Sequence, residues 1–426
     1  MYLVYSLILA AGALLASPYW LYKGLRERKY LGNFRQRLGW HLPAVDSSRR
    51  PLWIHAVSVG EVLAAKPLFL ALRKNCPHLP VIVSTVTITG HALARKTLSE
   101  ADAIVYFPFD FSFSVRRFLR HIRPLAVLLL ETELWPNFLR LCRKTHTPVL
   151  LANGRISDKS FRRYQRIRKI TTRMLADVNL LCVQTPEDGE RFLALGAGAE
   201  KTHVSGNLKF DSPLPTAESE SHWLGTVRDA LGITPQTPVV VIGSSMKGEE
   251  SVFLDALRAV RESLPETRFI LAPRHPERFD EVADLIRRYS IPFLRRTKIG
   301  TDSNTGAPLL LLDTIGELRS TYVLASIAVI GGSFLPFGGH NPLEPAACGK
   351  AIIFGPHMSN FRDLAGIFLK AHAARQATPE TLPSALLALL QDDAARRAMG
   401  ERALSAIRVN QGATAKTLEL IRPFIP

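Results

Sequence analysis

The chain has 426 residues, more than one ordinary domain holds and enough for two. Hydrophobic residues make up 47% of the sequence and charged residues 21%, which excludes a mostly disordered chain. The formal net charge of +17 indicates an anionic partner, whether nucleic acid, acidic lipid or a phosphorylated small molecule.

An uncharged apolar run occupies residues 2–22, and basic residues follow it at positions 23, 26, 28 and 29. As a helix, such a run spans roughly 30 Å, the thickness of the hydrocarbon core of a bilayer. A secretory signal carries its positive charges before the apolar run, whereas charges placed after it keep the rest of the chain in the cytoplasm. We therefore expect residues 1–23 to form a membrane anchor, single-pass or interfacial, with Pro18 favouring the interfacial form. The alternative is a buried first helix of a soluble domain.

Short apolar runs then alternate with amphipathic helical stretches. The apolar runs predict strands, which in the first half of the chain lie at residues 52–57, 81–86, 103–107, 125–130, 149–152 and 179–183. This alternation predicts an α/β fold in which a doubly wound parallel sheet carries helices on both faces.

A stretch rich in Pro, Ser and Glu, residues 211–223, interrupts the alternation, which then restarts. The second set of predicted strands lies at residues 239–242, 268–272, 309–313, 327–331 and 351–354, and helical patterns close the chain from residue 380. We therefore expect two Rossmann-like domains, residues 24–210 and 237–426, joined by a linker at residues 211–236. Two such domains facing each other would enclose a cleft lined by the loops at the carboxyl ends of the strands.

Carboxylates follow two of the strands predicted in the first half. Glu61, in the segment HAVSVGE, opens the helix after the first strand, and Glu131 and Glu133, in ETELWPN, follow the fourth. Ligands bind at such strand ends, so these carboxylates are candidates for a catalytic site. Alternatively, Glu61 complements a helix dipole, and Glu131 or Glu133 caps a helix or pairs with arginine. Lys209, in GNLKFD beside the linker, is placed to reach a phosphate or a carboxylate, unless it is simply solvated.

Four loops that suit an anion or a sugar follow strands in the second half. Their sequences are GSSMKGEE (243–250), PRHPER (273–278), DTIGEL (313–318) and GGSFLPFGGHNPLEP (331–345). In the last loop, Asn341 suits the N-cap and Pro342 the first position of a helix, so bare N–H groups would face a phosphate. Arg274 suits bidentate binding of a phosphate, and Glu344 suits ribose hydroxyls. Together the loops predict a ligand that contains a nucleotide, although neither a GxGxxG fingerprint nor a P-loop occurs.

Residues 155–173 form a basic segment in which Lys and Arg alternate with aromatic and apolar residues. Beside an anchor, such a segment predicts a surface for anionic lipid headgroups. The alternative is a solvated helix face without a partner.

The segments HAVSVGE, ETELWPN, GNLKFD, PRHPER, DTIGEL and GGHNPLEP, in this order, resemble those of bacterial 3-deoxy-D-manno-octulosonic acid (Kdo) transferases. The resemblance covers essentially the whole chain. It implies a GT-B fold and the inverting transfer of Kdo from CMP-Kdo to the lipid A precursor lipid IVA, with release of CMP, in lipopolysaccharide biosynthesis. It also implies an inner-membrane location with the catalytic domains on the cytoplasmic side, and neither a cofactor nor a metal. The four cysteines are scattered without a CxxC pair, so a structural zinc site is not expected either.

The resemblance further implies roles for individual residues. Glu61 would be the general base, and Glu131 and Lys209 would stabilise the transition state. CMP would be held by residues that match the family's motifs, namely Pro273, Arg274, Ile315, Gly316, Glu317, Asn341, Pro342, Leu343 and Glu344. The expected partners are CMP-Kdo, the lipid A precursor and the anionic lipids of the inner membrane.

Two other functions fit parts of the sequence. One is another GT-B enzyme that glycosylates a lipid from a UDP- or GDP-sugar, although the HNPLEP and ETELWP segments argue against it. The other is a membrane-tethered basic protein that binds nucleic acid, for which the positive charge would suffice. No nucleic-acid-binding module is recognisable, and the strand-end carboxylates would then have no purpose. We therefore expect no nucleic-acid partner.

Overall fold

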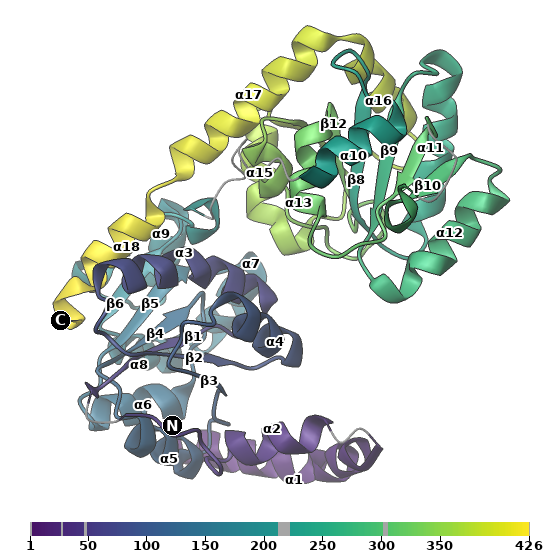
Figure 1. Ribbon diagram of the computed structural model, residues 1–426. Coiled ribbons are helices and arrows are strands. Elements are labelled where there is room, and N and C mark those ends of the chain that lie inside the picture. Colours follow the sequence, from purple (N-terminus) through teal and green to yellow (C-terminus); the bar gives the residue numbers. More distant parts are fainter. Residues whose placement is uncertain (1, 27–28, 47–48, 212–221, 301–305, 426) are drawn as a thin grey trace. The chain divides into compact units, whose positions relative to one another are not determined.

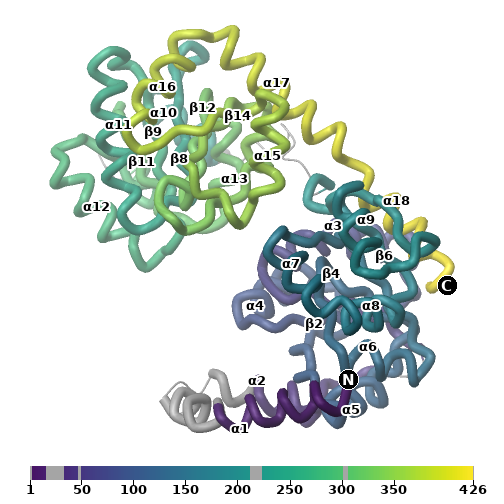
Figure 2. Tube along the Cα trace, turned by 180° about the vertical axis from the view of Figure 1, so that it is seen from behind, coloured from purple at the N-terminus to yellow at the C-terminus, as the bar shows by residue number. Residues whose placement is uncertain are grey.

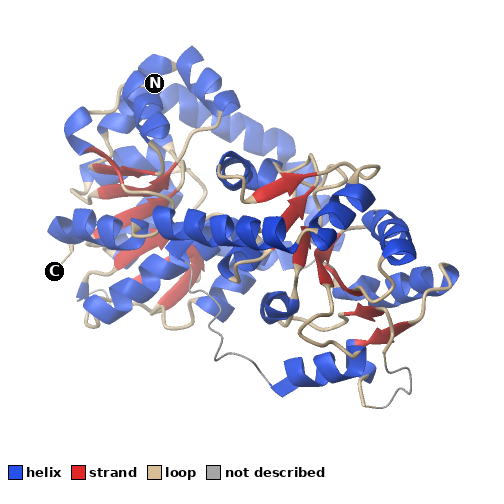
Figure 3. Ribbon diagram, turned by 90° about the horizontal axis from the view of Figure 1, so that it is seen from above, coloured by secondary structure: helices blue, strands red, loops and turns tan. Residues whose placement is uncertain are grey.

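The computed structural model describes residues 2–26, 29–46, 49–211, 222–300 and 306–425, and the side chains of residues 16–32 and 222 lie outside this description. The chain divides into two compact units. The first comprises Met1–Ser212 together with Asn410–Pro426, and the second comprises Pro213–Val409. In each unit, helices lie on both faces of a central sheet (Figures 1 and 3).

The first unit is built on a seven-stranded parallel sheet with the order β3-β2-β1-β4-β5-β6-β7. Its strands are β1 (Leu52–His55), β2 (Val81–Thr85), β3 (Ala103–Tyr106), β4 (Ala126–Leu130), β5 (Val149–Gly154), β6 (Leu180–Val183) and β7 (Thr202–Val204). The strands predicted in this half of the chain are confirmed. Strand β7 was not predicted because its three half-buried residues carry no continuous apolar run.

Alternate residues along each strand of this sheet enter two different cores, as a sheet covered on both faces requires. Leu52 and Ile54 join the core under α3, whereas Trp53 between them joins the core under α5 and α6. The helices of the unit are α2 (Lys29–Arg37), α3 (Val59–Asn75), α4 (Ile88–Thr97), α5 (Ser112–Ile122), α6 (Pro136–Lys144), α7 (Asp158–Arg166), α8 (Arg168–Ala176), α9 (Pro186–Ala194) and α18 (Ala413–Ile421), besides α1.

Helix α1 (Tyr2–Arg26) lies against the first unit through its first two turns. Tyr2 donates a hydrogen bond to Asp177 (3.2 Å), Tyr5 bonds to Asp110, and Ser6 exchanges hydrogen bonds with Asn137 at the start of α6. Apolar side chains of α1 are exposed, namely Leu3, Val4, Leu7, Ile8, Leu14 and Leu15. Across the described part of the chain, no helix is long and apolar enough to cross a membrane, so the expected single-pass anchor finds no support there. The side chains of Pro18 and of the basic residues after the apolar run lie outside this description.

The second unit carries another seven-stranded parallel sheet, with the order β10-β11-β9-β8-β12-β13-β14. Its strands are β8 (Val239–Ser245), β9 (Arg268–Pro273), β10 (Phe293–Arg295), β11 (Leu309–Leu311), β12 (Ile327–Ile330), β13 (Ala351–Phe354) and β14 (Ala374–Gln376). Its helices are α10 (His222–Leu231), α11 (Glu249–Ser263), α12 (Phe279–Arg288), α13 (Leu318–Thr321), α14 (Leu343–Ala347), α15 (Arg362–Lys370), α16 (Leu382–Gln391) and α17 (Asp393–Asn410). The two Rossmann-like units expected from the sequence are therefore confirmed.

The ends of the second unit differ from the expected domain limits of residues 211–236 and 237–426. Within the expected linker, Leu224 and Val227 of α10 are buried in the core of the second unit. At the other end, α18 was expected in the second domain but belongs to the first unit. It packs on α3, where Ala413 and Ile421 are buried in the core of the first unit (Figure 2). Asp211 fixes this return, because its carboxylate accepts the N–H groups of Gly412 (2.8 Å) and Thr414 (2.5 Å). Such long-range packing leaves no local pattern in the sequence.

Candidate active site

Strands β1 and β4 are neighbours in the first sheet. From β1 the chain adds β2 and β3 on one side, and from β4 it adds β5, β6 and β7 on the other, so the strand order reverses between β1 and β4. Parallel α/β sheets bind ligands outside the carboxyl ends of the strands at such a switch point. Glu61 follows β1 and Glu131 follows β4. The topology therefore brings the two predicted catalytic carboxylates to the same point of the sheet edge.

Glu61 lies in the first turn of α3 and is only 7% exposed. Its carboxylate accepts hydrogen bonds from the N–H of Val57 (2.8 Å) and the hydroxyl of Ser58 (3.1 Å), so Glu61 also stabilises the helix start. Burial, together with the negative charge of Glu131, raises the pKa of Glu61 to about 8. A carboxylate with a pKa in this range holds a proton firmly enough to act as a general base near neutral pH.

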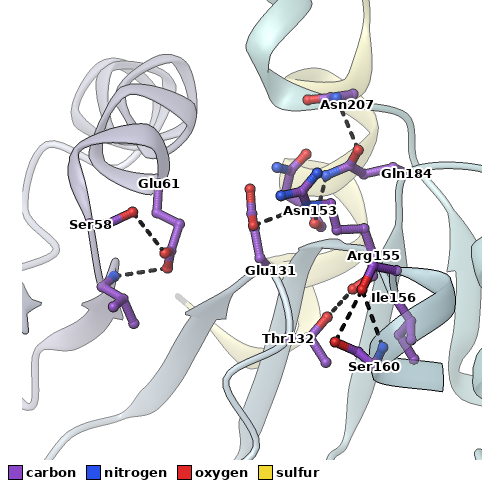
Figure 4. Close-up of polar contacts among 12 residues, drawn as sticks. Ser58, Glu61, Glu131, Thr132, Asn153, Arg155, Ile156, Ser160, Gln184 and Asn207 are labelled. Atoms are coloured by element: carbon purple, nitrogen blue, oxygen red, sulfur yellow. Dashed lines mark hydrogen bonds and ion pairs between the residues drawn. The ribbon is translucent and has the colours of Figure 1, made fainter. Parts of the chain in front are cut away.

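Glu131 forms ion pairs with two cations from different parts of the chain. Its Oε1 lies 3.3 Å from Nζ of Lys209, and its Oε2 lies 3.1 Å from Nε of Arg155. Figure 4 shows Glu131 between Glu61, at the start of α3, and Arg155. The backbone of Glu131 has a φ of +57°, a strained conformation for a residue with a side chain, and such strain gathers at functional sites.

Glu133 is a third carboxylate near this point. It accepts a hydrogen bond from the indole N–H of Trp135 (3.1 Å). Burial raises the pKa of Glu133 to about 7, and the charge of Glu131 acts in the same direction. The alternative of pairing with an arginine is observed for Glu131, which contacts Arg155, whereas among the described residues the partner of Glu133 is this indole.

A set of amides positions Lys209, and the sequence analysis did not identify it. Asn153, buried and with a φ of +57°, accepts the N–H of Leu208 (3.0 Å). Gln184 donates to the carbonyl of Asn153 (3.0 Å) and accepts from the side chain of Asn207 (3.0 Å), as Figure 4 shows. Asn207 in turn accepts the N–H of Lys209 (3.0 Å). The segment before Lys209 is therefore fixed to the ends of β5 and β6.

Arg155 was assigned by sequence to the basic segment 155–173, but its guanidinium contacts Glu131. The one signal for this role is its position directly after β5, the neighbour of β4. The remaining cations of that segment are exposed on α7 and α8, among them Arg162, Arg163, Arg166 and Arg168, beside the exposed side chains of Ile167 and Ile170.

In the second unit the switch point lies between β8 and β12. Residues 243–250, which form the end of β8, the loop after it and the start of α11, were expected to offer amides and hydroxyls to an external anion. Instead, carboxylates of the same segment accept hydrogen bonds from these amides and hydroxyls. Glu249 accepts the N–H of Met246 (2.9 Å), while Glu250 accepts the N–H of Gly248 (3.2 Å) and the hydroxyl of Ser245 (3.0 Å).

The predicted CMP-binding residues lie at or after the ends of three strands of this sheet, β11, β9 and β12. After β9, Pro273 is buried whereas Arg274 is exposed, and the N–H of Arg274 bonds to the carbonyl of Ser245 (3.0 Å). No hydrogen bond or ion pair of the Arg274 guanidinium is found within residues 2–26, 29–46, 49–211, 222–300 and 306–425. This cation is therefore available to a ligand.

The loop after β11 presents Ile315, which is 71% exposed, and Gly316, whose φ of +91° favours glycine. The carboxylate of Glu317 is held by the guanidinium of Arg296 (3.0 and 3.2 Å) and the hydroxyl of Thr314 (2.6 Å). These contacts fix the side chain of Glu317, and residues 315 and 316 are the part of the loop that is exposed to solvent.

The loop after β12 differs in detail from the expectation for Asn341 and Pro342. Helix α14 begins at Leu343, so Pro342 rather than Asn341 precedes its first residue. Asn341 still caps this turn, because its side chain accepts the N–H of Leu343 (3.1 Å) and also bonds to Glu344. Burial raises the pKa of Glu344, and the charges of Arg319 and Arg274 oppose this shift. Arg274 and Glu344, from different loops, are thus close enough to interact.

All four cysteines are free. In the portion of the chain that the structure describes, no group of three or more His, Cys, Asp or Glu side chains is arranged to hold a metal ion.

Two Rossmann-like units with ligand loops at their switch points define the class of GT-B proteins. Among solved structures, MurG from Acinetobacter baumannii is similar over 88% of this chain and 99% of its own, with a TM-score of 0.53 and 15% identity. A UDP-GlcNAc 2-epimerase from Neisseria meningitidis is similar over 88% of this chain and 100% of its own, with a TM-score of 0.56 and 12% identity. These likenesses concern the fold alone.

The family model for 3-deoxy-D-manno-octulosonic-acid transferase (kdotransferase) matches residues 32–212. A 3-deoxy-D-manno-octulosonic acid transferase of Bordetella pertussis is 35% identical over 99% of both chains, and one of Haemophilus influenzae is 32% identical over 94% of this chain and 93% of its own. The chain therefore belongs to the family of 3-deoxy-D-manno-octulosonic acid transferases, and its activity is that of a Kdo-transferring glycosyltransferase.

Proposed function

We propose that this protein transfers Kdo from CMP-Kdo to the lipid A precursor lipid IVA, with inversion at the anomeric carbon and release of CMP. The observation that carries the proposal is the group formed by Glu61, Glu131, Lys209 and Arg155 at the switch point of the first unit. It combines a proton acceptor with a carboxylate that two cations fix, which is what an inverting sugar transfer requires.

Glu61 is the proposed general base. As a hydroxyl oxygen of the acceptor bonds to the anomeric carbon of Kdo, its proton passes to the carboxylate of Glu61, and the bond from that carbon to the CMP phosphate breaks. The buried position of Glu61 supports this role, because burial raises its pKa to about 8, close to the working pH of a general base.

Glu131 is proposed to stabilise the positive charge that develops on the anomeric carbon. Lys209 and Arg155 each hold one of its oxygens, so the carboxylate stays in one orientation and needs little rearrangement during the reaction. The need for a fixed carboxylate would account for the two cations that contact Glu131. We infer that Lys209 acts by positioning Glu131 as well as by its own charge.

The second unit is proposed to bind the nucleotide. Arg274 supplies an exposed guanidinium suited to the CMP phosphate, and the loops at 315–317 and 341–344 supply backbone groups and Glu344. Pro273, Leu343 and Pro342 are buried and support these loops.

Association with the cytoplasmic face of the inner membrane is proposed to occur at its surface. Exposed apolar side chains of α1, including Leu3, Leu7 and Ile8, suit the acyl boundary. The exposed arginines of α7 and α8, with Ile167 and Ile170 among them, suit anionic headgroups.

The test is a transfer assay with detergent-solubilised protein, CMP-Kdo and tetraacylated lipid A precursor, with products weighed by mass spectrometry. A mass gain of one or more Kdo units with release of CMP is expected, both with and without EDTA. Parallel reactions with UDP- and GDP-sugars test the nearest alternative. Transfer from one of those donors and none from CMP-Kdo would overturn the proposal.

A further inference from the structure

Glu249 joins the two loops that meet at the switch point of the second unit. Its Oε2 accepts the N–H groups of Met246 (2.9 Å) and Gly332 (2.6 Å). Its Oε1 accepts those of Phe334 (2.9 Å) and Leu335 (3.4 Å). The side chain is fully buried. Four main-chain N–H groups from the loops after β8 and β12 thus converge on one carboxylate.

Burial raises the pKa of Glu249 and the hydrogen bonds from the four N–H groups oppose this rise, and the geometry of those bonds favours the ionised carboxylate. Both oxygens accept hydrogen bonds from N–H groups, and a proton on either oxygen would place a donor against a donor. Glu250 beside it is also buried, but the guanidinium of Arg278 neutralises its charge at 2.8 and 3.2 Å. Within residues 222–300 and 306–425, no Lys or Arg pairs with Glu249. In the described part of this unit, main-chain N–H dipoles are the groups that balance its negative charge.

Main-chain N–H groups at this point of a Rossmann-like unit are the groups that hold the phosphates of a dinucleotide. Here they hold an anion that belongs to the chain. Gly332 has a φ of +67°, and its carbonyl accepts the N–H of Gly339 (2.6 Å), close to Asn341. On the other side, the main-chain N–H of Arg274 donates to the carbonyl of Ser245, the last residue of β8. Through Gly332, Glu249 is thus linked to the loop that carries Asn341, one of the residues proposed to hold the nucleotide.

We propose that Glu249 determines donor specificity by occupying, as a built-in anion, the amide cradle that would otherwise accept a second phosphate. This inference rests on the proposed function, in which Arg274 and the 341–344 loop hold the single phosphate of a nucleoside monophosphate sugar. A nucleoside diphosphate donor would bring its further phosphate toward a buried carboxylate that main-chain N–H groups already occupy and that no Lys or Arg of the described second unit neutralises. The loop thereby excludes UDP- and GDP-sugars by charge rather than by shape.

The test compares CMP and CDP binding by titration calorimetry in the wild type and in Glu249→Ala and Glu249→Gln. The wild type is expected to bind CMP at least as tightly as CDP. Removing the charge should raise the affinity for CDP relative to CMP by about tenfold or more, because a unit charge a few ångströms from a phosphate acts strongly in a partly buried site. If the substitution only loosened the loop, the affinities for CMP and CDP would fall by the same factor.

Glu250→Gln is the matched control, since it removes a neighbouring buried carboxylate whose charge Arg278 already balances. It should leave the ratio of CDP to CMP affinity unchanged. An unchanged ratio in folded Glu249 variants would overturn the inference while leaving the proposed function intact. If neither variant folds, tighter binding of CDP than of CMP by the wild type overturns it. Absence of CMP binding to the wild type would instead contradict the proposed function, and the inference with it.

Discussion

The ammonium group of Lys209 lies 3.3 Å from Oε1 of Glu131, although the two residues are 78 positions apart in the chain. Arg155 holds the other oxygen of Glu131 from the end of β5. Glu61 lies close enough for the charge of Glu131 to raise its pKa. Lys209 and Arg155 thus fix the carboxylate of Glu131, and the charge of Glu131 raises the pKa of Glu61.

Replacing Lys209 with Met should lower kcat by about 100-fold, because loss of one charged partner loosens a group that stabilises the transition state. Lys209→Arg keeps the charge and should retain most of the rate. Single-turnover kinetics with saturating donor measures the effect, and thermal unfolding serves as the control for folding. A wild-type rate in Lys209→Met would show that Glu131 does not need this partner.

The rate should rise with pH, since a general base works in its ionised form. With the pKa of Glu61 at about 8, kcat/KM is expected to increase through a limb centred near that value. Glu131→Gln removes a negative charge that raises this pKa, so the limb should move to lower pH even though the maximal rate falls. The full pH profile of both proteins provides the measurement. A limb that stays in place, or moves upward, would contradict the assigned coupling.

The parallel α/β pattern was sufficient to predict that Glu61 and Glu131 follow strands and face the same cleft, because the carboxyl ends of parallel strands lie at one edge of the sheet. The pairing of β1 with β4, which makes these two strands neighbours, comes from the structure. The partners of Glu131 could not be predicted in the same way. Arg155 opens a basic segment that is otherwise exposed, and Lys209 reaches Glu131 through a chain of amides that includes Asn153. Neither contact follows from spacing in the sequence.

Glu249 shows a second limit of sequence analysis. An acidic residue at a helix start normally complements the helix dipole, and nothing local distinguishes a solvated carboxylate from one that four N–H groups enclose. The short strands β7, β10 and β14 have only three residues each and lack a sufficient apolar run. The return of α18 to the first unit depends on packing between parts of the chain far apart in sequence.

Arg274→Ala should weaken CMP binding by about 10- to 100-fold, as expected for loss of a charge-assisted contact to phosphate. Because the guanidinium is exposed, the melting temperature should not change. Calorimetric titration of CMP measures the effect. Arg287→Ala, on the exposed face of α12, is the matched control and should bind CMP like the wild type. If Arg274→Ala and Arg287→Ala bound CMP with equal affinity, Arg274 would not be part of the nucleotide site.

Replacing Arg162, Arg163, Arg166 and Arg168 together with Gln should weaken binding to vesicles that contain anionic lipid, since each basic residue near such a surface contributes about 1 kcal/mol. These side chains are exposed, so the fold should be retained. Cosedimentation with anionic vesicles measures the effect, and neutral phosphatidylcholine vesicles provide the control. Undiminished binding to anionic vesicles would indicate a solvated helix face without a lipid partner.

The most direct test of the account compares turnover with nucleotide binding in Glu61→Gln. The substitution keeps the size of the side chain and removes its capacity to accept the proton, while the proposed CMP-binding residues belong to the other unit. We expect Kdo transfer to be lost and the CMP dissociation constant to equal that of the wild type. Transfer at the wild-type rate would contradict the assignment of Glu61 as the general base and, with it, the central claim about this site.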